Sequence, residues 1–508
     1  MAYYLSPPVL VLSLAARKPL CDHGCMKSRG LLKLHIKRTL QTFCLVLLTP
    51  LFSAGQATQT EAPAGRQLAS WLAAFDGTNW DAYREFLSKN FASQPKRALL
   101  DPAFRDRTGG FDLKKIEEET PTKVTALLQE RASDGFARME LEVEAAEPHR
   151  IVNTDMHPVD PPAEFALPHM SDSELVAALR RKLEEEAAAD KFAGAVLVAK
   201  NGKPIFAQAY GLADREHNIP NRLETRFSIA SMNKMITAVA TMQLVQAEKL
   251  NLDDPLAKYL TDYPNKELAT KVTIGELLTN TGGTGDIWGP EFDKHRLELR
   301  TLQDYVNLYG NRPLRFEPGS RWEYSNFGFI LLGAVIEKVS GENYYDYVRK
   351  HIYIPAGMTS TGSEPEDQAV ANRNIGYTRT GNGGWQPNMA GLSYRGTSAG
   401  GGNSTVADLL RFANALQENR LLDAQHTKLL TTGRVVTPFG HDAYGFGVQT
   451  FNGIQCFGHN GGGSGVNGDL EMCLDSSYTV VALANMDPPA AERVSQFIIN
   501  RLPAAKPN

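Results

Sequence analysis

Cysteine is scarce in this sequence. The five cysteines among 508 residues are Cys21, Cys25, Cys44, Cys456 and Cys473. The run Cys21-Asp22-His23-Gly24-Cys25 is typical of a metal site, but it lies in a segment that we expect to be removed. Cys456 and Cys473 could form a disulfide between neighbouring strands. Because the sequence supplies no evidence of the geometry that a disulfide needs, we expect two free buried thiols.

The sequence also lacks a basic block, a nucleotide-binding loop and a metal-binding motif. Its 53 lysines and arginines are scattered among 57 acidic residues, and the net charge is −4, which excludes a typical nucleic-acid-binding protein. It contains no HExxH motif, no paired-cysteine zinc pattern and no phosphate loop, so we expect no metal, no nucleotide and no other cofactor. There is neither an internal repeat nor a low-complexity tract.

The N-terminal segment has the pattern of an export signal. No acidic residue lies between Cys25 and Glu61, and five basic residues precede an apolar run from Phe43 to Ala54. This run is shorter than the roughly 20 residues of a membrane helix, and small residues follow it. We therefore expect residues 1–57 to be a cleaved signal peptide, and the mature protein to be periplasmic or secreted without a stable membrane span. An uncleaved N-terminal anchor is the alternative.

Residues 58–163 are predicted to form a small α+β domain. Apolar residues at helical spacing occur between Leu68 and Phe91, and strand-like segments follow them. These segments are 122–129, 136–144 and 149–155. The pattern loosely resembles the cone-shaped domains similar to nuclear transport factor 2 (NTF2-like). Asp160-Pro161-Pro162 then predicts a linker, because consecutive prolines block both a helix and a strand ladder.

Residues 164–508 are predicted to form a larger mixed α/β domain. Ser171 to Glu174 form a capping box that begins a helix. Asn201-Gly202 then joins two strands in a hairpin. After a long helical middle, strands return at 444–451, 454–459, 468–474 and 478–484, before a last helix at 489–502. The pattern predicts one antiparallel sheet that is built from both ends of the domain, flanked by helices, with a helical subdomain between.

Ser231 and Lys234 are the candidate catalytic pair. A serine hydroxyl needs a base within hydrogen-bonding reach, and residues three apart on a helix share a face. At a helix N-terminus the backbone N–H of Ser231 also lies where an oxyanion would form. The spacing alone is weak evidence, because Ser93 and Lys96 repeat it around an internal proline.

Further motifs strengthen the assignment. They are Arg226 to Lys234, Thr273 to Gly283, Phe316 to Gly319, Tyr324-Ser325-Asn326, and Gly458 to Gly462. In this order and spacing they resemble the class C β-lactamase family, which includes penicillin-binding D-alanyl-D-alanine carboxypeptidases, D-aminopeptidases and related serine esterases. The resemblance covers about Ala193 to Met486. It implies a β-lactamase/transpeptidase-like fold and serine hydrolase chemistry through an acyl-enzyme.

The resemblance also implies roles for individual residues. Tyr324 beside a cationic lysine could be held partly as phenolate and share the base role with Lys234, and the sequence does not divide that role between them. Asn326 could hydrogen-bond a substrate amide or hold Lys234. The backbone N–H groups of Ser231 and Gly462 are the predicted oxyanion hole.

The third motif departs from the lactamase pattern. His459 and Asn460 stand where a lysine and a threonine are usual. His459 would keep a hydrogen-bond donor near the nucleophile, with a charge that depends on pH. Asn460 and Gly461 are predicted to contact substrate, with Gly461 allowing close approach to the strand. Since Asn460 replaces a carboxylate-binding hydroxyl, we expect D-amino-acid peptides or small esters as substrates, and at most weak β-lactam hydrolysis.

Two alternatives remain open. Gly396-Thr397-Ser398-Ala399-Gly400 fits the nucleophile elbow of α/β-hydrolases, with Asp423 and His459 following in the required order. No buried strand is predicted before this elbow and no helix directly after it, so we interpret the match as coincidence. The second alternative is a non-catalytic penicillin-binding-like protein that binds a ligand or the cell wall. The sequence leaves the oligomeric state open.

Overall fold

The computed structural model describes residues 62–77, 79–100, 104–105, 108–380, 384–438, 440–473 and 476–503. The predicted signal peptide and the group from Cys21 to Cys25 lie outside these residues. Within them, no helix combines the length and the apolar character that crossing a membrane requires. The same residues contain no group of three histidine, cysteine or acidic side chains that could hold a metal ion.

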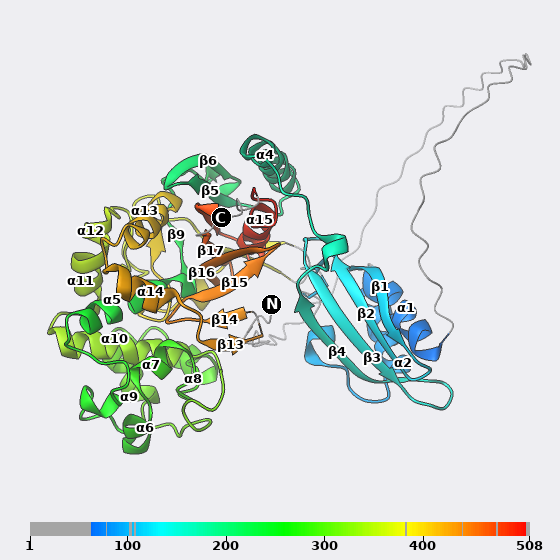
Figure 1. Cartoon of the computed structure of the whole chain (residues 1–508), viewed down its shortest axis with the longest axis horizontal. Helices are drawn as coiled ribbons and strands as arrows, with labels where there is room; N and C mark the ends of the chain where they lie inside the picture. Colours follow the sequence, from blue (N-terminus) through cyan, green and yellow to red (C-terminus); the bar gives the residue numbers. More distant parts are fainter. Residues whose placement is uncertain are drawn as a thin grey trace, which may run out of the picture. The chain divides into compact units, whose positions relative to one another are not determined.

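Two helices and a four-stranded antiparallel sheet make up the α+β part between residues 63 and 159 (Figure 1). The elements are α1 (Pro63–Asp76), α2 (Trp80–Asn90), β1 (Phe111–Glu119), β2 (Lys123–Glu130), β3 (Phe136–Val143) and β4 (Ile151–Val159). Strand β3 alternates buried Met139 and Leu141 with partly exposed Glu140 and Glu142, as the sequence predicts. In the core the indole of Trp71 donates a hydrogen bond to the Tyr83 hydroxyl at 3.2 Å. The likeness to NTF2-like domains stays a prediction.

An eight-stranded antiparallel sheet dominates the rest of the chain, in the order β13-β14-β15-β16-β17-β18-β5-β6. Its strands are β5 (Gly194–Lys200), β6 (Lys203–Tyr210), β13 (Val435–Thr437), β14 (Gly440–Asp442), β15 (Gly447–Phe451), β16 (Ile454–Gly463), β17 (Val466–Cys473) and β18 (Tyr478–Ala484). Strand β18 pairs with β5 in antiparallel register, from Tyr478 opposite Lys200 to Ala484 opposite Gly194. The sheet is therefore built from strands of both ends of the predicted 164–508 domain, as the sequence predicts.

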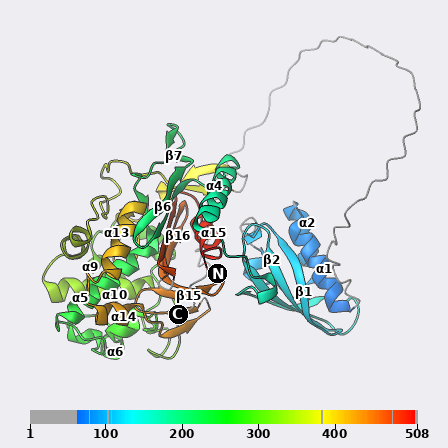
Figure 2. The ribbon, with the colours of Figure 1, turned by 45° about the horizontal axis from the view of Figure 1, so that its top comes forward.

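Helices cover both faces of this sheet (Figure 2). On one face, α4 (Asp172–Ala188) and α15 (Ala490–Ile499) bury an apolar cluster that includes Val196 and Val198. The alternate residues of the same strand, Ala195 and Leu197, join a second cluster beneath α5 (Asn233–Gln246) and α13 (Val406–Gln417). We call the α4/α15 side the back face and the α5 side the front face. The capping box predicted at Ser171 is present at the start of α4.

The helical middle lies between the two groups of strands. Its helices are α6 (Lys266–Lys271), α7 (Ile274–Leu278), α8 (Pro290–His295), α9 (Leu302–Tyr309), α10 (Asn326–Ser340), α11 (Tyr344–Val348), α12 (Ile354–Ala356) and, beyond α13, α14 (Ala424–Thr431). Short strands complete it: β7 (Leu212–Asp214), β8 (Ile219–Pro220), β9 (Phe227–Ser228), β10 (Tyr377–Arg379), β11 (Trp385–Pro387) and β12 (Asn403–Ser404). Buried residues of α10 and α5 belong to the same apolar cluster. The starts of the two helices are neighbours, because Lys234 of α5 hydrogen-bonds Asn326 of α10.

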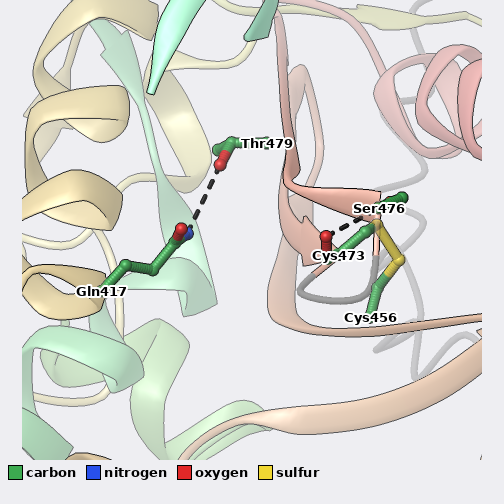
Figure 3. Close-up of a disulfide and its surroundings, with 5 residues drawn as sticks. All are labelled: Gln417, Cys456, Cys473, Ser476 and Thr479. Atoms are coloured by element: carbon green, nitrogen blue, oxygen red, sulfur yellow. Dashed lines mark hydrogen bonds between the residues drawn. A yellow bond between two sulfur atoms is a disulfide. The ribbon is translucent and has the colours of Figure 1, made fainter. Parts of the chain in front are cut away.

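A disulfide joins Cys456 of β16 to Cys473 of β17 (Figure 3). The expectation of two free thiols is therefore wrong. The register that places Phe457 opposite Met472 also makes Cys456 and Cys473 cross-strand neighbours, with their Cα atoms 4.1 Å apart. This pairing register could not be derived from the sequence. Both cysteines belong to the apolar cluster of the back face.

Candidate active site

Ser231 lies in a short 3-10 turn directly before α5. The preceding residue, Ala230, has a positive φ of 42°, a conformation that a non-glycine residue adopts only when its surroundings hold it. Those surroundings are the loop before β12. The N–H of Gly401 donates to the Ala230 carbonyl at 3.0 Å, and the N–H of Ile229 donates to the Gly402 carbonyl at 3.1 Å. The loop therefore fixes the backbone that presents the Ser231 hydroxyl.

Lys234 lies one turn further along, with 0% of its surface exposed. Its Nζ is 3.2 Å from the Ser231 Oγ and 2.7 Å from the Asn326 Oδ1, and it also contacts the Ala399 carbonyl oxygen. The amide and carbonyl oxygens can only accept hydrogen bonds. A neutral amine has two N–H groups, and these two oxygens occupy both. Its lone pair is then left for the third neighbour, which is the hydroxyl of Ser231.

The environment favours this neutral form of Lys234. Burial lowers the pKa of the Lys234 amine to about 7, although the negative charge of Asp286 opposes the shift. A large fraction of the amine is therefore unprotonated near neutral pH. Strongly shifted pKa values cluster at functional sites, so this shift marks Lys234 as a candidate catalytic base.

Asp286 is a part of this site that the sequence interpretation missed. Its Oδ1 accepts a hydrogen bond from the Asn326 Nδ2 at 2.9 Å, while the other end of the same amide contacts Lys234. Asp286 lies between α7 and α8, forty positions before Asn326, in a glycine-rich loop that matches no catalytic motif. Only the closeness of Asp286 to the start of α10 indicates its role, and this closeness arises from the tertiary fold.

Tyr324 precedes α10 and hydrogen-bonds the Ser231 hydroxyl through its phenol. The Lys234 Nζ lies 4.7 Å from the centre of its ring. Burial raises the pKa of Tyr324; the bond to Ser231 lowers that pKa, and the charges of Asp286 and Asp442 raise it further. These shifts favour the neutral phenol over the predicted partial phenolate. Because a large fraction of Lys234 is neutral near pH 7, less positive charge is present to stabilise a phenolate, and the amine itself is the better candidate for the base.

Strand β16 brings His459 and Gly461 to the front face. A Cβ at Gly461 would lie 2.4 Å from the Ile229 carbonyl oxygen and 2.9 Å from the Ser231 nitrogen. A side chain at this position would therefore collide with the backbone of the nucleophile, and the strand can approach it only with a glycine. The predicted close approach of a substrate to Gly461 stays a prediction.

The neighbouring residues of β16 face the other way. Asn460 donates a hydrogen bond to Glu492 of α15 at 3.1 Å, and a Cβ at Gly462 would meet Pro488. Because successive strand residues point to opposite faces, the predicted contact of the Asn460 side chain with substrate is not supported. The backbone N–H of Gly462 lies in the plane of the sheet, and its part in an oxyanion hole stays a prediction.

His459 is neutral over the ordinary pH range. Burial lowers its pKa to about 4, with Lys234 adding to the effect and a contact with the Asn460 carbonyl opposing it. That contact is made by Nδ1. A carbonyl can only accept, so Nδ1 carries the proton of the neutral ring and Nε2 is bare. His459 therefore offers an acceptor at Nε2, where the sequence predicted a donor with a pH-dependent charge.

The rival serines do not form active sites. Ser398 is 0% exposed, and its hydroxyl fills the space left by Gly333 of α10, where a Cβ would lie 2.3 Å away. Asp423, the proposed acid of that triad, contacts His426 and caps α14. Lys96 forms an ion pair with Asp155 at 2.8 Å, not a contact with Ser93. Both matches are coincidences of sequence.

The fold and this cluster of side chains define a class. An antiparallel sheet flanked by helices is the β-lactamase/transpeptidase-like fold, and here Ser231 and Lys234 lie at the start of a helix on its front face. Residues 179–504, well over half of the chain, match the family model described as Beta-lactamase, and the chain belongs to this family.

Three known proteins illustrate the relationship. Penicillin-binding protein 4* of Bacillus subtilis (strain 168) is 28% identical over 321 residues, which cover 58% of this chain and 69% of that protein. Esterase EstB of Burkholderia gladioli is 36% identical over 198 residues, or 35% of this chain and 50% of EstB. A D-stereospecific amidohydrolase from Streptomyces sp. superimposes with a TM-score of 0.53 and 26% identity, over 63% of this chain and 97% of that one. The chain also spans only 63% of the curated relative PbpX.

Proposed function

We propose that this protein is an exported serine hydrolase that forms an acyl-enzyme on Ser231. The observation that supports the proposal most strongly is the buried Lys234 amine, whose two obligate acceptors leave its lone pair for the Ser231 hydroxyl. A base with a pKa of about 7 is matched to proton transfer at neutral pH. Export is proposed from the basic and apolar N-terminal segment alone.

In the acylation step, the lone pair of Lys234 removes the Ser231 proton as Oγ attacks the substrate carbonyl. The new C–O bond converts the carbonyl into a tetrahedral oxyanion, which the N–H groups of Ser231 and Gly462 would stabilise. The protonated Lys234 then returns its proton, through the Tyr324 phenol, to the leaving amine or alcohol. The C–N or C–O bond breaks and the acyl-enzyme remains.

In the deacylation step, water takes the place of the leaving group. Neutral Lys234, with Tyr324 as the relay, removes a proton from that water as it attacks the ester carbonyl of the acyl-enzyme. Collapse of the second tetrahedral intermediate returns the proton to the Ser231 oxygen and releases the acid. Tyr324 acts throughout as a proton relay with a protonated resting state, consistent with the direction of its pKa.

We propose D-amino-acid peptides or amides and small esters as substrates. The similarity to EstB and to a D-stereospecific amidohydrolase supports this class. The third motif supports it as well, since neutral His459 provides no cation for a substrate carboxylate, and the Asn460 side chain is engaged with Glu492. The same two features argue against potent β-lactam hydrolysis.

Covalent capture tests the proposal. A fluorophosphonate, a boronate and a labelled penicillin are offered to the folded protein, with mass spectrometry to find the modified residue. We expect Ser231 to be labelled by the fluorophosphonate, Ser231→Ala to abolish labelling and ester turnover, and Ser398→Ala to retain both. If none of the three probes modifies Ser231, the protein is a non-catalytic binding member of the family. Undiminished turnover by Ser231→Ala would contradict the assignment of the nucleophile.

Export has its own test. The N-terminus of the protein recovered from a cell fraction outside the inner membrane would be sequenced. A start near residue 58 supports a cleaved signal peptide, whereas an intact N-terminus in the membrane fraction supports the anchor.

A further inference from the structure

The loop between α7 and α8 delivers one carboxylate to the interior of the site. The Asp286 Oδ1 accepts hydrogen bonds from its neighbour Ile287 N at 2.7 Å, from Asn326 N at 3.3 Å and from Asn326 Nδ2 at 2.9 Å. Its Oδ2 lies 3.3 Å from the same Nδ2. The loop is held in turn by Arg312, which donates to the Asp286 carbonyl oxygen at 2.8 Å. Every contact on this carboxylate comes from a donor.

These contacts decide which way the Asn326 amide faces. A carboxylate can only accept, so it selects the NH₂ end of the amide. The oxygen end must then face Lys234, where it accepts a hydrogen bond at 2.7 Å. If the amide were reversed, its NH₂ would confront the Lys234 N–H groups and its oxygen would confront the Asp286 carboxylate. Asp286 therefore fixes an acceptor at the position that occupies one N–H of the lysine.

Resting on the function proposed above, we propose that Asp286 is a positioning residue of this enzyme. Acting through Asn326, it holds the Lys234 amine with its lone pair directed at the Ser231 hydroxyl. Among the described residues Asp286 makes no hydrogen bond to Ser231 or Lys234, so its effect on the position of the amine passes through the Asn326 amide.

The charge of Asp286 has a second effect. The charge that acts on the pKa of Lys234 is that of Asp286, from the α7–α8 loop. Two further titratable groups face the amine: His459 of β16, which is neutral near pH 7 because its pKa is lowered to about 4, and Tyr324, whose ring centre lies 4.7 Å from Nζ. Burial raises the pKa of Asp286, which its hydrogen bonds and Lys234 lower. The negative charge of Asp286 also helps to raise the pKa of Tyr309 in α9. Since Asp286 favours the ammonium form, its negative charge keeps the pKa of Lys234 from falling further.

Two substitutions separate position from charge. Asp286→Asn keeps the shape, and its amide oxygen can still accept from Asn326, so the position is retained and the charge is lost. Asp286→Ala loses both. The matched control is Asp442→Asn, another buried carboxylate held by an asparagine, Asn280 at 3.1 Å, which acts on Tyr324 and not on Lys234.

For Asp286→Ala we expect kcat to fall about 100-fold with KM nearly unchanged, because a slightly misplaced base slows the chemical step. For Asp286→Asn we expect most of kcat to remain and the acidic limb of the pH–rate profile to move to lower pH. Asp442→Asn should leave that limb where it is. The profile is measured with an ester substrate and, independently, as the rate of fluorophosphonate labelling.

The outcomes distinguish this proposal from the function on which it rests. If the wild-type protein neither hydrolyses the ester nor is labelled by the fluorophosphonate, the proposed function is refuted. The effect of Asp286 on the pKa of Lys234 can still be tested in that case, by titrating the Lys234 ¹³Cε resonance, which is assigned with Lys234→Arg. Full kcat in Asp286→Ala overturns the positioning role of Asp286, and an unchanged Lys234 titration in Asp286→Asn overturns its charge effect. If Asp286→Ala does not fold, as judged by circular dichroism, Asp286→Leu takes its place, because leucine keeps the volume but cannot accept a hydrogen bond from Asn326.

Discussion

The two faces of strands β16 and β17 bury ionisable groups of opposite kinds. On the front face, Lys234 lies beneath His459 and Gly461 with its pKa lowered. On the back face, Asp469 and Glu471 of β17 lie with Glu492 of α15, and burial raises the pKa of all three carboxyl groups. Mutual repulsion among the carboxyls adds to the shift of Asp469 and Glu471. Desolvation thus drives both faces toward neutral forms.

The two faces differ in the charges and hydrogen bonds that surround their buried ionisable groups. The negative charge that acts on the front amine is that of Asp286, and the amine contacts two oxygen acceptors, those of Asn326 and Ala399. On the back face, one oxygen of Glu471 and one of Glu492 are buried with no hydrogen-bond partner among the described residues. The front face is thus arranged around a base that can gain and lose a proton near neutral pH. The back face buries three carboxyl groups whose ionisation would destabilise the folded state.

The largest effect should follow from removing the front-face amine. Lys234→Met keeps the apolar stem and should lower kcat/KM by about 10³-fold or more, because general-base catalysis is lost. The wild-type activity should rise as the pH increases through about 7, the pKa at which Lys234 becomes neutral, and the variant should lack this limb. Ester hydrolysis between pH 5 and 9 measures both, with the exposed Lys249→Met as control. A variant with wild-type rates would assign the base elsewhere.

The disulfide of the back face should matter for stability. Cys456→Ser combined with Cys473→Ser should lower the free energy of unfolding by about 3 kcal/mol, because the unfolded chain regains the freedom of the closed loop. Urea unfolding of the variant, compared with the wild type in oxidised and reduced form, measures the difference. An equal loss in the reduced wild type would confirm that the bond, and not the serine substitutions, is responsible.

Gly461 and Gly462 are adjacent residues of β16 that face opposite sides of the sheet, so the same substitution can be compared on both faces. Gly461→Ala places a methyl group against the Ser231 backbone and should lower kcat about 100-fold through displacement of the nucleophile. Gly462→Ala places the same methyl against Pro488 on the back face, so its main effect should be a stability loss of about 1–3 kcal/mol. Thermal melting and ester turnover on both variants compare the faces. The reverse pattern would contradict the assignment of front and back.

The smallest effect concerns pH and the back face. The raised pKa of Glu492 means that the folded state keeps a proton that the unfolded state releases between about pH 4.5 and 7. Stability should therefore fall as the pH rises through this window. Glu492→Gln mimics the protonated acid and should stabilise the protein by about 1 kcal/mol at pH 8, with no gain at pH 4. Equal gains at both pH values would show that ionisation is not the cause.

The sequence was most informative where chemistry depends on local spacing. Ser231 and Lys234 are one helical turn apart, and Tyr324 and Asn326 lie at the start of the next long helix. The residues that contact one another in the site therefore lie within short motifs that the sequence shows. Strand alternation also places Asn460 on the face opposite His459, because successive strand residues point to opposite faces. The capping box at Ser171 and the sheet closed by the two strand-forming ends were predicted correctly.

What remained hidden depends on tertiary proximity. Asp286 reaches Asn326 from a loop without a motif, and no local pattern indicates that Asp469, Glu471 and Glu492 share a buried space. The pKa of Tyr324 depends on burial and on the charges of Asp286 and Asp442, none of which a local motif contains. The bond between Cys456 and Cys473 required the register of β16 on β17, which side-chain alternation alone does not define.

The pairing of β18 with β5 also means that the large sheet cannot form until nearly the whole domain is available. Helix α5, with Ser231 and Lys234, comes early in the domain, whereas β16, β17 and β18 come last. His459 and Gly461 can therefore join the front face only after these last strands have paired. We expect a chain truncated before β16 not to react with a fluorophosphonate.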